Sequence, residues 1–95
     1  MKRKYEGVIV LNTQGREDSV DDLINSVGKE IEGEGAKLEQ IDRMGRKEFA
    51  YTPRKLNVGY YVNYFFEADP AAIDKIQTKL KLNEEVFLQY YLRLN

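Results

Sequence analysis

Residues Val58 to Glu67, V-G-Y-Y-V-N-Y-F-F-E, form the most strand-like stretch of this 95-residue chain. Aromatic and β-branched residues dominate it, a composition that favours an extended backbone on a pleated, half-buried surface. Asp69-Pro70 follows almost at once and supplies a helix cap with proline at the first helical position. A strand that passes directly into a helix therefore anchors the prediction of the fold.

Two segments have the period of an amphipathic helix. The first lies between Asp18 and Glu34, where the apolar residues fall on one helical face: Val20, Leu23, Ile24, Val27 and Ile31. The second begins at Asp69-Pro70 and ends near Asn83, with its own apolar face: Ala72, Ile73, Ile76 and Leu80. Both stripes are wide enough to pack against a sheet.

Three further segments have the pattern of strands. Tyr5 to Leu11 is short, apolar and β-branched, as expected of a central strand. Ala36 to Met44 alternates, with Leu38 and Ile41 among polar neighbours, and the extended character resumes after Gly45 and breaks near Pro53. Val86 to Leu94 alternates as well and predicts the last strand.

The order of elements is β-α-β-β-α-β, which is the split βαβ or ferredoxin-like plan of the α+β class. Two right-handed crossovers place both helices on one face of a four-stranded antiparallel sheet and leave the other face bare. We expect residues 1–95 to form a single domain.

Composition argues against an enzyme. The chain has no cysteine and no histidine, which removes thiolate metal sites and the commonest general base. Its acids cluster on the first predicted helix as a solvated face, and no glycine pattern resembles a phosphate-binding loop. We expect no catalytic residues, metal, cofactor, small-molecule substrate or membrane span, and a cytoplasmic location.

Basic residues gather between Arg43 and Lys55, R-M-G-R-K-E-F-A-Y-T-P-R-K. This segment contains five basic residues and one acidic residue, Glu48, so its net charge is +4 in a chain of net charge −1. Such a patch suits a polyanion, because Lys and Arg displace counterions from phosphate. The alternative is a solvated charged hairpin. Phe49 and Tyr51 alternate with the charged residues and suit core or rim positions better than base stacking.

Alternation also assigns side chains to the bare face of the sheet. Val62, Tyr64 and Phe66 are predicted to face the helices, which leaves their neighbours for the bare face: Tyr61, Asn63, Phe65 and Glu67. On the last strand, Gln89, Tyr91 and Arg93 are expected to join them. Exposed aromatics there could stack on bases or anchor a partner protein, and the alternative is a wide core with tyrosines at its rim.

Three blocks of the sequence resemble a known family, the sixth protein of the bacterial small ribosomal subunit. The first is Arg3-Lys4-Tyr5-Glu6 leading into Val8-Ile9-Val10. The most specific is Gly45-Arg46-Lys47-Glu48-Phe49-Ala50-Tyr51, followed by Lys55-Leu56 and Tyr60-Tyr61-Val62. The third is Leu80-Lys81-Leu82-Asn83-Glu84-Glu85-Val86.

The resemblance implies a non-catalytic component of the small subunit. It would bind the central domain of small-subunit ribosomal RNA together with the eighteenth small-subunit protein. Carried over by position, the RNA-contacting residues would be Arg3, Tyr5, Arg46, Lys47 and Lys55; the charge pattern adds Arg43 and Arg54.

The chain departs from the family after the third block, where the family commonly has arginine and this chain has Phe87 and Leu88. That suggests an apolar contact at this position, to the partner protein. Two other functions remain open. One is a ferredoxin-like protein–protein or ligand-sensing module that forms a homodimer without RNA. The other, more remote, is an acylphosphatase-like enzyme.

Overall fold

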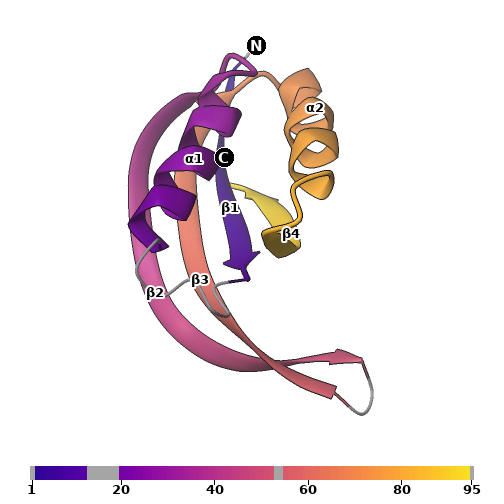
Figure 1. Cartoon of the computed structure of the whole chain (residues 1–95). Helices are drawn as coiled ribbons and strands as arrows, with labels where there is room; N and C mark the ends of the chain where they lie inside the picture. Colours follow the sequence, from indigo (N-terminus) through magenta and orange to yellow (C-terminus); the bar gives the residue numbers. More distant parts are fainter. Residues whose placement is uncertain (1, 13–19, 53–54, 95) are drawn as a thin grey trace.

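A computed structural model of the chain describes residues 2–12, 20–52 and 55–94, without the side chains of residues 48–58 (Figure 1). Its six elements are β1 (Arg3–Leu11), α1 (Val20–Glu32), β2 (Lys37–Thr52), β3 (Lys55–Ala68), α2 (Pro70–Lys81) and β4 (Val86–Arg93). The strands pair antiparallel in one sheet of order β2-β3-β1-β4. The predicted α+β, ferredoxin-like arrangement is confirmed.

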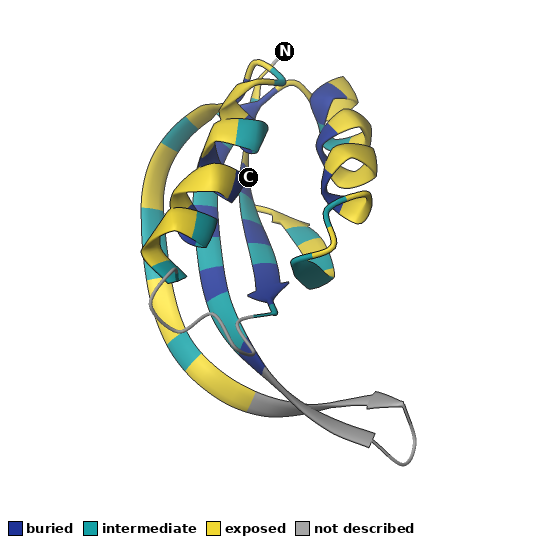
Figure 2. Ribbon diagram, in the orientation of Figure 1, coloured by how far each residue is buried: buried dark blue, intermediate teal, exposed yellow. Residues whose placement is uncertain are grey.

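Both helices cover the same face of the sheet, and the core lies between them and the central strands (Figures 1 and 2). The hydroxyl of Tyr64 is buried, and it donates a hydrogen bond of 2.7 Å to the Ile24 carbonyl of α1. Burying each large apolar side chain contributes roughly 1.5–3 kcal/mol. On the helix side of the sheet, the largest fully buried side chains come from four elements: Ile9, Leu11, Ile24, Val27, Ile31, Val62, Tyr64, Phe66, Ile76 and Leu80.

Strand β2 reaches the core through an irregularity in its pairing with β3. Leu38 and Ile41 are three residues apart, so a regular strand would place them on opposite faces. The register shifts between Leu38 and Gln40, and this bulge turns both apolar side chains toward the helices. The sheet gains two core contacts from a strand that is otherwise polar.

Beyond the main sheet, β2 and β3 continue as a two-stranded arm (Figure 1). The last pair between β1 and β3 joins Leu11 to Tyr60, whereas β2 and β3 stay paired as far as Thr52 and Lys55. The predicted strand and its resumption after Gly45 are thus one continuous element. Pro53, where the sequence predicts the break, lies outside the described residues, as do Asp18 and Ser19 before α1.

Candidate RNA-binding surface

The cations predicted to contact RNA fall into two groups at opposite ends of the sheet. Arg3 pairs with Ala68 at one end of β3, and Lys47 pairs with Gly59 near the other. The two partners are nine positions apart along β3, which at about 3.3 Å per residue is about 30 Å. The structure therefore does not gather them into one site. We call them the arm group, with Arg43, Arg46 and Lys47, and the amino-terminal group, with Arg3.

A second bulge in β2 arranges the arm group. The register shifts between Arg43 and Gly45, and Gly45 has a φ of +94°, a conformation that glycine adopts without strain. Arg43 pairs with Val62 and Arg46 with Tyr60, so both arginines lie on the helix side of the sheet. Without the extra residue they would lie on opposite faces.

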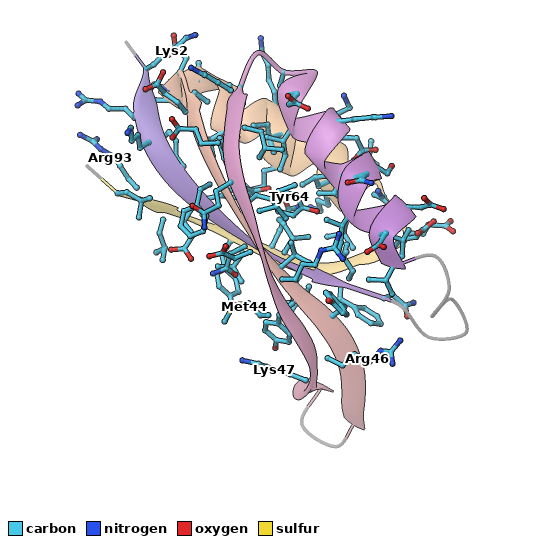
Figure 3. All side chains as sticks on the ribbon, turned by 90° about the vertical axis from the view of Figure 1, so that its left-hand side faces the viewer. Lys2, Met44, Arg46, Lys47, Tyr64 and Arg93 are labelled. Atoms are coloured by element: carbon cyan, nitrogen blue, oxygen red, sulfur yellow. The ribbon has the colours of Figure 1, made fainter. Side chains whose placement is uncertain are left out.

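Arg43 is paired with a carboxylate of the neighbouring helix. Arg43 donates a hydrogen bond to the carboxylate of Asp21 in the first turn of α1, and both side chains are largely exposed. This ion pair ties the edge strand to the helix and leaves part of the guanidinium fork open to solvent. Arg46 is exposed one bulge further along, where it projects on the helix side in Figure 3.

Lys47 occupies the other face of the same strand. Its Nζ lies 5.8 Å from the centre of the Tyr61 ring, within the range of a cation–π interaction. Figure 3 shows Lys47 and Arg46 projecting to opposite sides of the ribbon. A polyanion that runs along this edge of the sheet therefore meets positive charge on both of its faces.

The remaining predicted residues of the arm have no described side chains. Lys55 begins β3, but its side chain lies outside the described residues, as do those of Phe49 and Tyr51, and Arg54 is outside altogether. Their roles stay predictions from the sequence.

At the amino-terminal end, Arg3 is half-buried and its neighbours Lys2 and Lys4 are exposed. Arg93 of β4 joins this end, because it lies next to Tyr5 in the sheet (Figure 3). Tyr5 itself is only 7% exposed and its ring stacks on Phe66 at 5.9 Å. The prediction that Tyr5 contacts RNA does not fit this position, since its ring is part of the core.

The sheet face opposite the helices, here called the open face, has the predicted residues of β3. Tyr61, Asn63 and Phe65 lie there, half-buried, and the Asn63 amide donates a hydrogen bond of 2.6 Å to the Glu6 carboxylate. Val10, also on this face, is completely buried. Side chains therefore cover part of the open face, and it is not bare throughout.

The prediction for β4 was wrong in its choice of face. Gln89, Tyr91 and Arg93 pair with Ile9, Gly7 and Tyr5, so they lie on the helix side. The cause is a bulge in which Val10 pairs with Leu88 and Leu11 with Val86, which leaves Phe87 as an extra, half-buried residue. One extra residue moves all later side chains to the other face. The open face of β4 instead has residues that the sequence argument missed: Leu88, Tyr90 and Leu92.

Gly7 of β1 explains how the ring of Tyr91 fits on the core side of β4. A Cβ at Gly7 would lie 3.0 Å from the Tyr91 ring and 3.3 Å from that of Phe66, so the missing side chain makes room for Tyr91. Tyr91 packs edge-on against Phe66 at 6.3 Å. Burial raises the pKa of the Tyr91 phenol, and it raises that of Tyr64 as well, where the nearby Arg43 partly offsets the effect.

Within residues 2–12, 20–52 and 55–94, no group of three or more His, Cys, Asp or Glu side chains is placed to hold a metal ion. No helix among them is both long and apolar enough to cross a membrane. The features that stand out are charged and apolar surfaces, which points to macromolecular partners.

Comparison with known proteins agrees with this conclusion. A sequence model of the family described as ribosomal protein S6 matches residues 4–92 of the chain. The chain belongs to that family. The small ribosomal subunit protein bS6 of Akkermansia muciniphila is 44% identical over 89 residues, which cover 94% of this chain and 95% of the relative. That of Carboxydothermus hydrogenoformans is 30% identical over 93 residues, with 98% and 97% covered.

Solved structures show the same relationship. The crystal structure of 30S ribosomal protein S6 from Thermotoga maritima superposes with a TM-score of 0.83 at 26% identity, covering 98% of this chain and 88% of that one. The C-terminal domain of the MgtC protein from Mycobacterium tuberculosis, with a TM-score of 0.62 at 9% identity, shares the fold alone. This S6 family member is therefore a protein of the small ribosomal subunit, and the family is not enzymatic.

Proposed function

We propose that this chain binds the central domain of small-subunit ribosomal RNA together with the eighteenth small-subunit protein, as a structural component of the subunit. The observation that supports this most is the position of Arg46 and Lys47, exposed on opposite faces of β2 where the arm leaves the sheet. Family membership makes ribosomal RNA the natural polyanion for this surface.

The chemistry of the arm group suits an RNA backbone. The guanidinium groups of Arg43 and Arg46 can each donate paired hydrogen bonds to phosphate oxygens, whereas the Lys47 ammonium acts as a compact point charge. Because contacts of this kind are made to the backbone, they recognise the shape of a folded RNA rather than its bases. Lys55 and Arg54 are proposed as further contacts on the same arm.

The amino-terminal group supplies a second contact. Along β3, Arg3 lies about 20 Å from Arg43 and about 30 Å from Lys47, so an RNA that contacts both groups must extend along the sheet over this distance. Two weak contacts at fixed separation favour an RNA fold that presents phosphates at both places. This geometry suits a folded RNA domain better than an unstructured strand.

The open face is proposed as the contact for the partner protein. Its aromatic rings Tyr61 and Phe65 on β3 lie on the same face as Leu88 on β4, across the intervening strand β1, and such an apolar surface suits a protein interface. Phe87, the bulge residue beside Leu88, is proposed to join it. Tyr91 and Arg93 lie on the helix side instead and do not contribute to it.

The test measures binding to central-domain RNA with and without the eighteenth protein, over a series of salt concentrations. We expect the double variant Arg46→Ala/Lys47→Ala to bind more weakly and to lose about 0.9 in log–log salt slope per duplex phosphate contact removed. The matched control is Lys75→Ala/Lys81→Ala, which removes the same charge from exposed positions on α2. Equal effects of the two double variants, or none from the first, would contradict the assignment.

A further inference from the structure

The outer edge of β4 differs from that of the other edge strand. The sheet ends at β4, and within the described part of the chain no strand pairs with its outer side. The opposite edge, β2, is interrupted by three bulges and has charged side chains along its length, features that discourage strand addition. The β1–β4 pairing has one register shift, at its Val86 end, and is regular from Leu88 to Arg93.

The side chains of β4 also favour another strand. Leu88, Tyr90 and Leu92 alternate on the open face and are 37%, 50% and 54% exposed. An unpaired edge with alternating apolar side chains is a template for β-augmentation, because backbone hydrogen bonds and cross-strand contacts form together.

Helix α2 lies beside this edge and carries an acidic residue near its start and a basic residue near its end. The Gln89 amide of β4 donates a hydrogen bond of 2.9 Å to the Gln77 carbonyl of α2, which fixes the helix above the middle of the strand. A shallow hollow runs along the two elements and is lined by Asp74, Gln77, Thr78, Lys81 and Gln89. Asp74 lies on one side of Gln77 and Lys81 on the other, and both are exposed.

We propose that a second copy of this chain pairs antiparallel along β4, with a two-fold axis through Gln89, and continues the sheet across both molecules. The axis reverses the order of charges on α2, so Asp74 of each copy lies opposite Lys81 of the other. On the open face, Leu88 then lies opposite Tyr90 of the second copy.

This self-complementarity selects a second copy over an unrelated strand. Asp74 and Lys81 are seven residues apart on one helix, about 10 Å along its axis, so they do not pair within one molecule. They meet only when the helix faces its own reversed copy, and each dimer then has the pair twice. One strand and one helix make a small interface, which belongs to the weak, transient class. The open face stays accessible in such a dimer.

Sedimentation velocity over protein concentrations from about 1 μM to about 1 mM tests the proposal, and we expect a concentration-dependent dimer. Lys81→Asp and Asp74→Lys should each weaken the dimer about tenfold, because two attractive pairs become repulsive. The double exchange Asp74→Lys/Lys81→Asp should restore it, since the charges are again complementary. A monomer at every concentration, or single and double variants of equal effect, would overturn the proposal.

A cross-link tests the register. The chain has no cysteine, so Gln89→Cys introduces a single thiol next to its own copy on the proposed axis. Opposite Cα atoms in an antiparallel pair are about 4.5–5.5 Å apart, within the span of a disulfide. Mild oxidation should yield a covalent dimer, whereas the control Glu39→Cys on the β2 edge should not. Equal cross-linking at both positions, or a complex that forms only with a different protein, would overturn the proposal. None of these variants alters the arm group, so RNA binding stays a separate result.

Discussion

The two edge strands of this sheet, β2 and β4, differ in length, regularity and charge. β2 runs from Lys37 to Thr52 and is bent by three bulges, one of which is built on the positive φ of Gly45. β4 has half its length, from Val86 to Arg93, and the register of its pairing with β1 shifts once, next to its first residue. The charged, bent edge suits a polyanion, whereas the short apolar edge suits another polypeptide chain.

In both strands a bulge decides which side chains face the helices. The shift beside Gly45 places Arg43 and Arg46 on one side of β2, and the extra Phe87 sends Tyr91 into the core. Position in the sequence alone therefore misassigns the residues that follow a bulge, because every later side chain changes face.

The largest expected effect separates two neighbouring tyrosines of β4. Tyr91→Ala removes a ring that packs against Phe66 and fills the space above Gly7, so we expect a loss of about 3 kcal/mol in the free energy of unfolding. Tyr90→Ala, on the open face and 50% exposed, should cost under about 1 kcal/mol. Urea unfolding of the two variants measures both. A larger loss for Tyr90→Ala would mean that the faces of β4 are reversed.

Alkaline pH tests Tyr64, the buried tyrosine of β3. Burial raises the pKa of Tyr64 above the ordinary value of 10.0 for a tyrosine, so the folded protein keeps the proton that the unfolded chain releases. The stabilising contribution of Tyr64 is complete below pH 10 and is lost as pH rises above it, by up to about 1.4 kcal/mol per pH unit.

Unfolding curves between pH 9 and pH 11 should show this decline in the wild-type chain and a smaller one in Tyr64→Phe. The variant is expected to be less stable at neutral pH, because the Ile24 carbonyl loses its hydrogen-bond donor. An equally steep alkaline decline in Tyr64→Phe would show that Tyr64 is not its source.

A smaller effect tests the bulge itself. Gly45 and Gly35 have φ values of +94° and +90°, and neither has an atom near the position of a Cβ, so alanine strains the backbone equally at both. We expect Gly45→Ala and Gly35→Ala each to cost about 1 kcal/mol in stability. Only Gly45→Ala should also weaken RNA binding, because only that change shifts Arg46 and Lys47. Equal RNA affinity in both variants would show that the bulge at Gly45 is not needed for RNA binding.

Much of the fold could be predicted from the sequence because its periodic segments are unambiguous. The helical stripe from Val20 to Ile31 fits one period only, and the aromatic and β-branched composition of the stretch ending at Glu67 favours a strand. In contrast, β4 is apolar in both phases at its start, with Val86 and Phe87 side by side. A local bulge settles its phase, and no pattern of hydrophobicity reveals it.

The candidate site was predictable in composition and not in arrangement. Charge counting found the arm group, and the family resemblance added Arg3, but neither shows that Arg3 and Lys47 lie about 30 Å apart along β3. Tyr5 was placed among the RNA contacts by position alone, and its stacking on Phe66 became visible only in the packed structure. Distances between strands depend on register, which a linear sequence does not display.

The central claim is that the β2 edge, and not the helical face, lies against ribosomal RNA. A cysteine-free chain allows a direct measurement, in which a cleavage reagent is tethered at one position and the cut nucleotides are mapped. Met44→Cys, 49% exposed beside the arm group, should direct cleavage to central-domain RNA in the complex with the eighteenth protein; Lys75→Cys on α2 should direct little or none. Cleavage from Lys75→Cys with none from Met44→Cys would contradict the account.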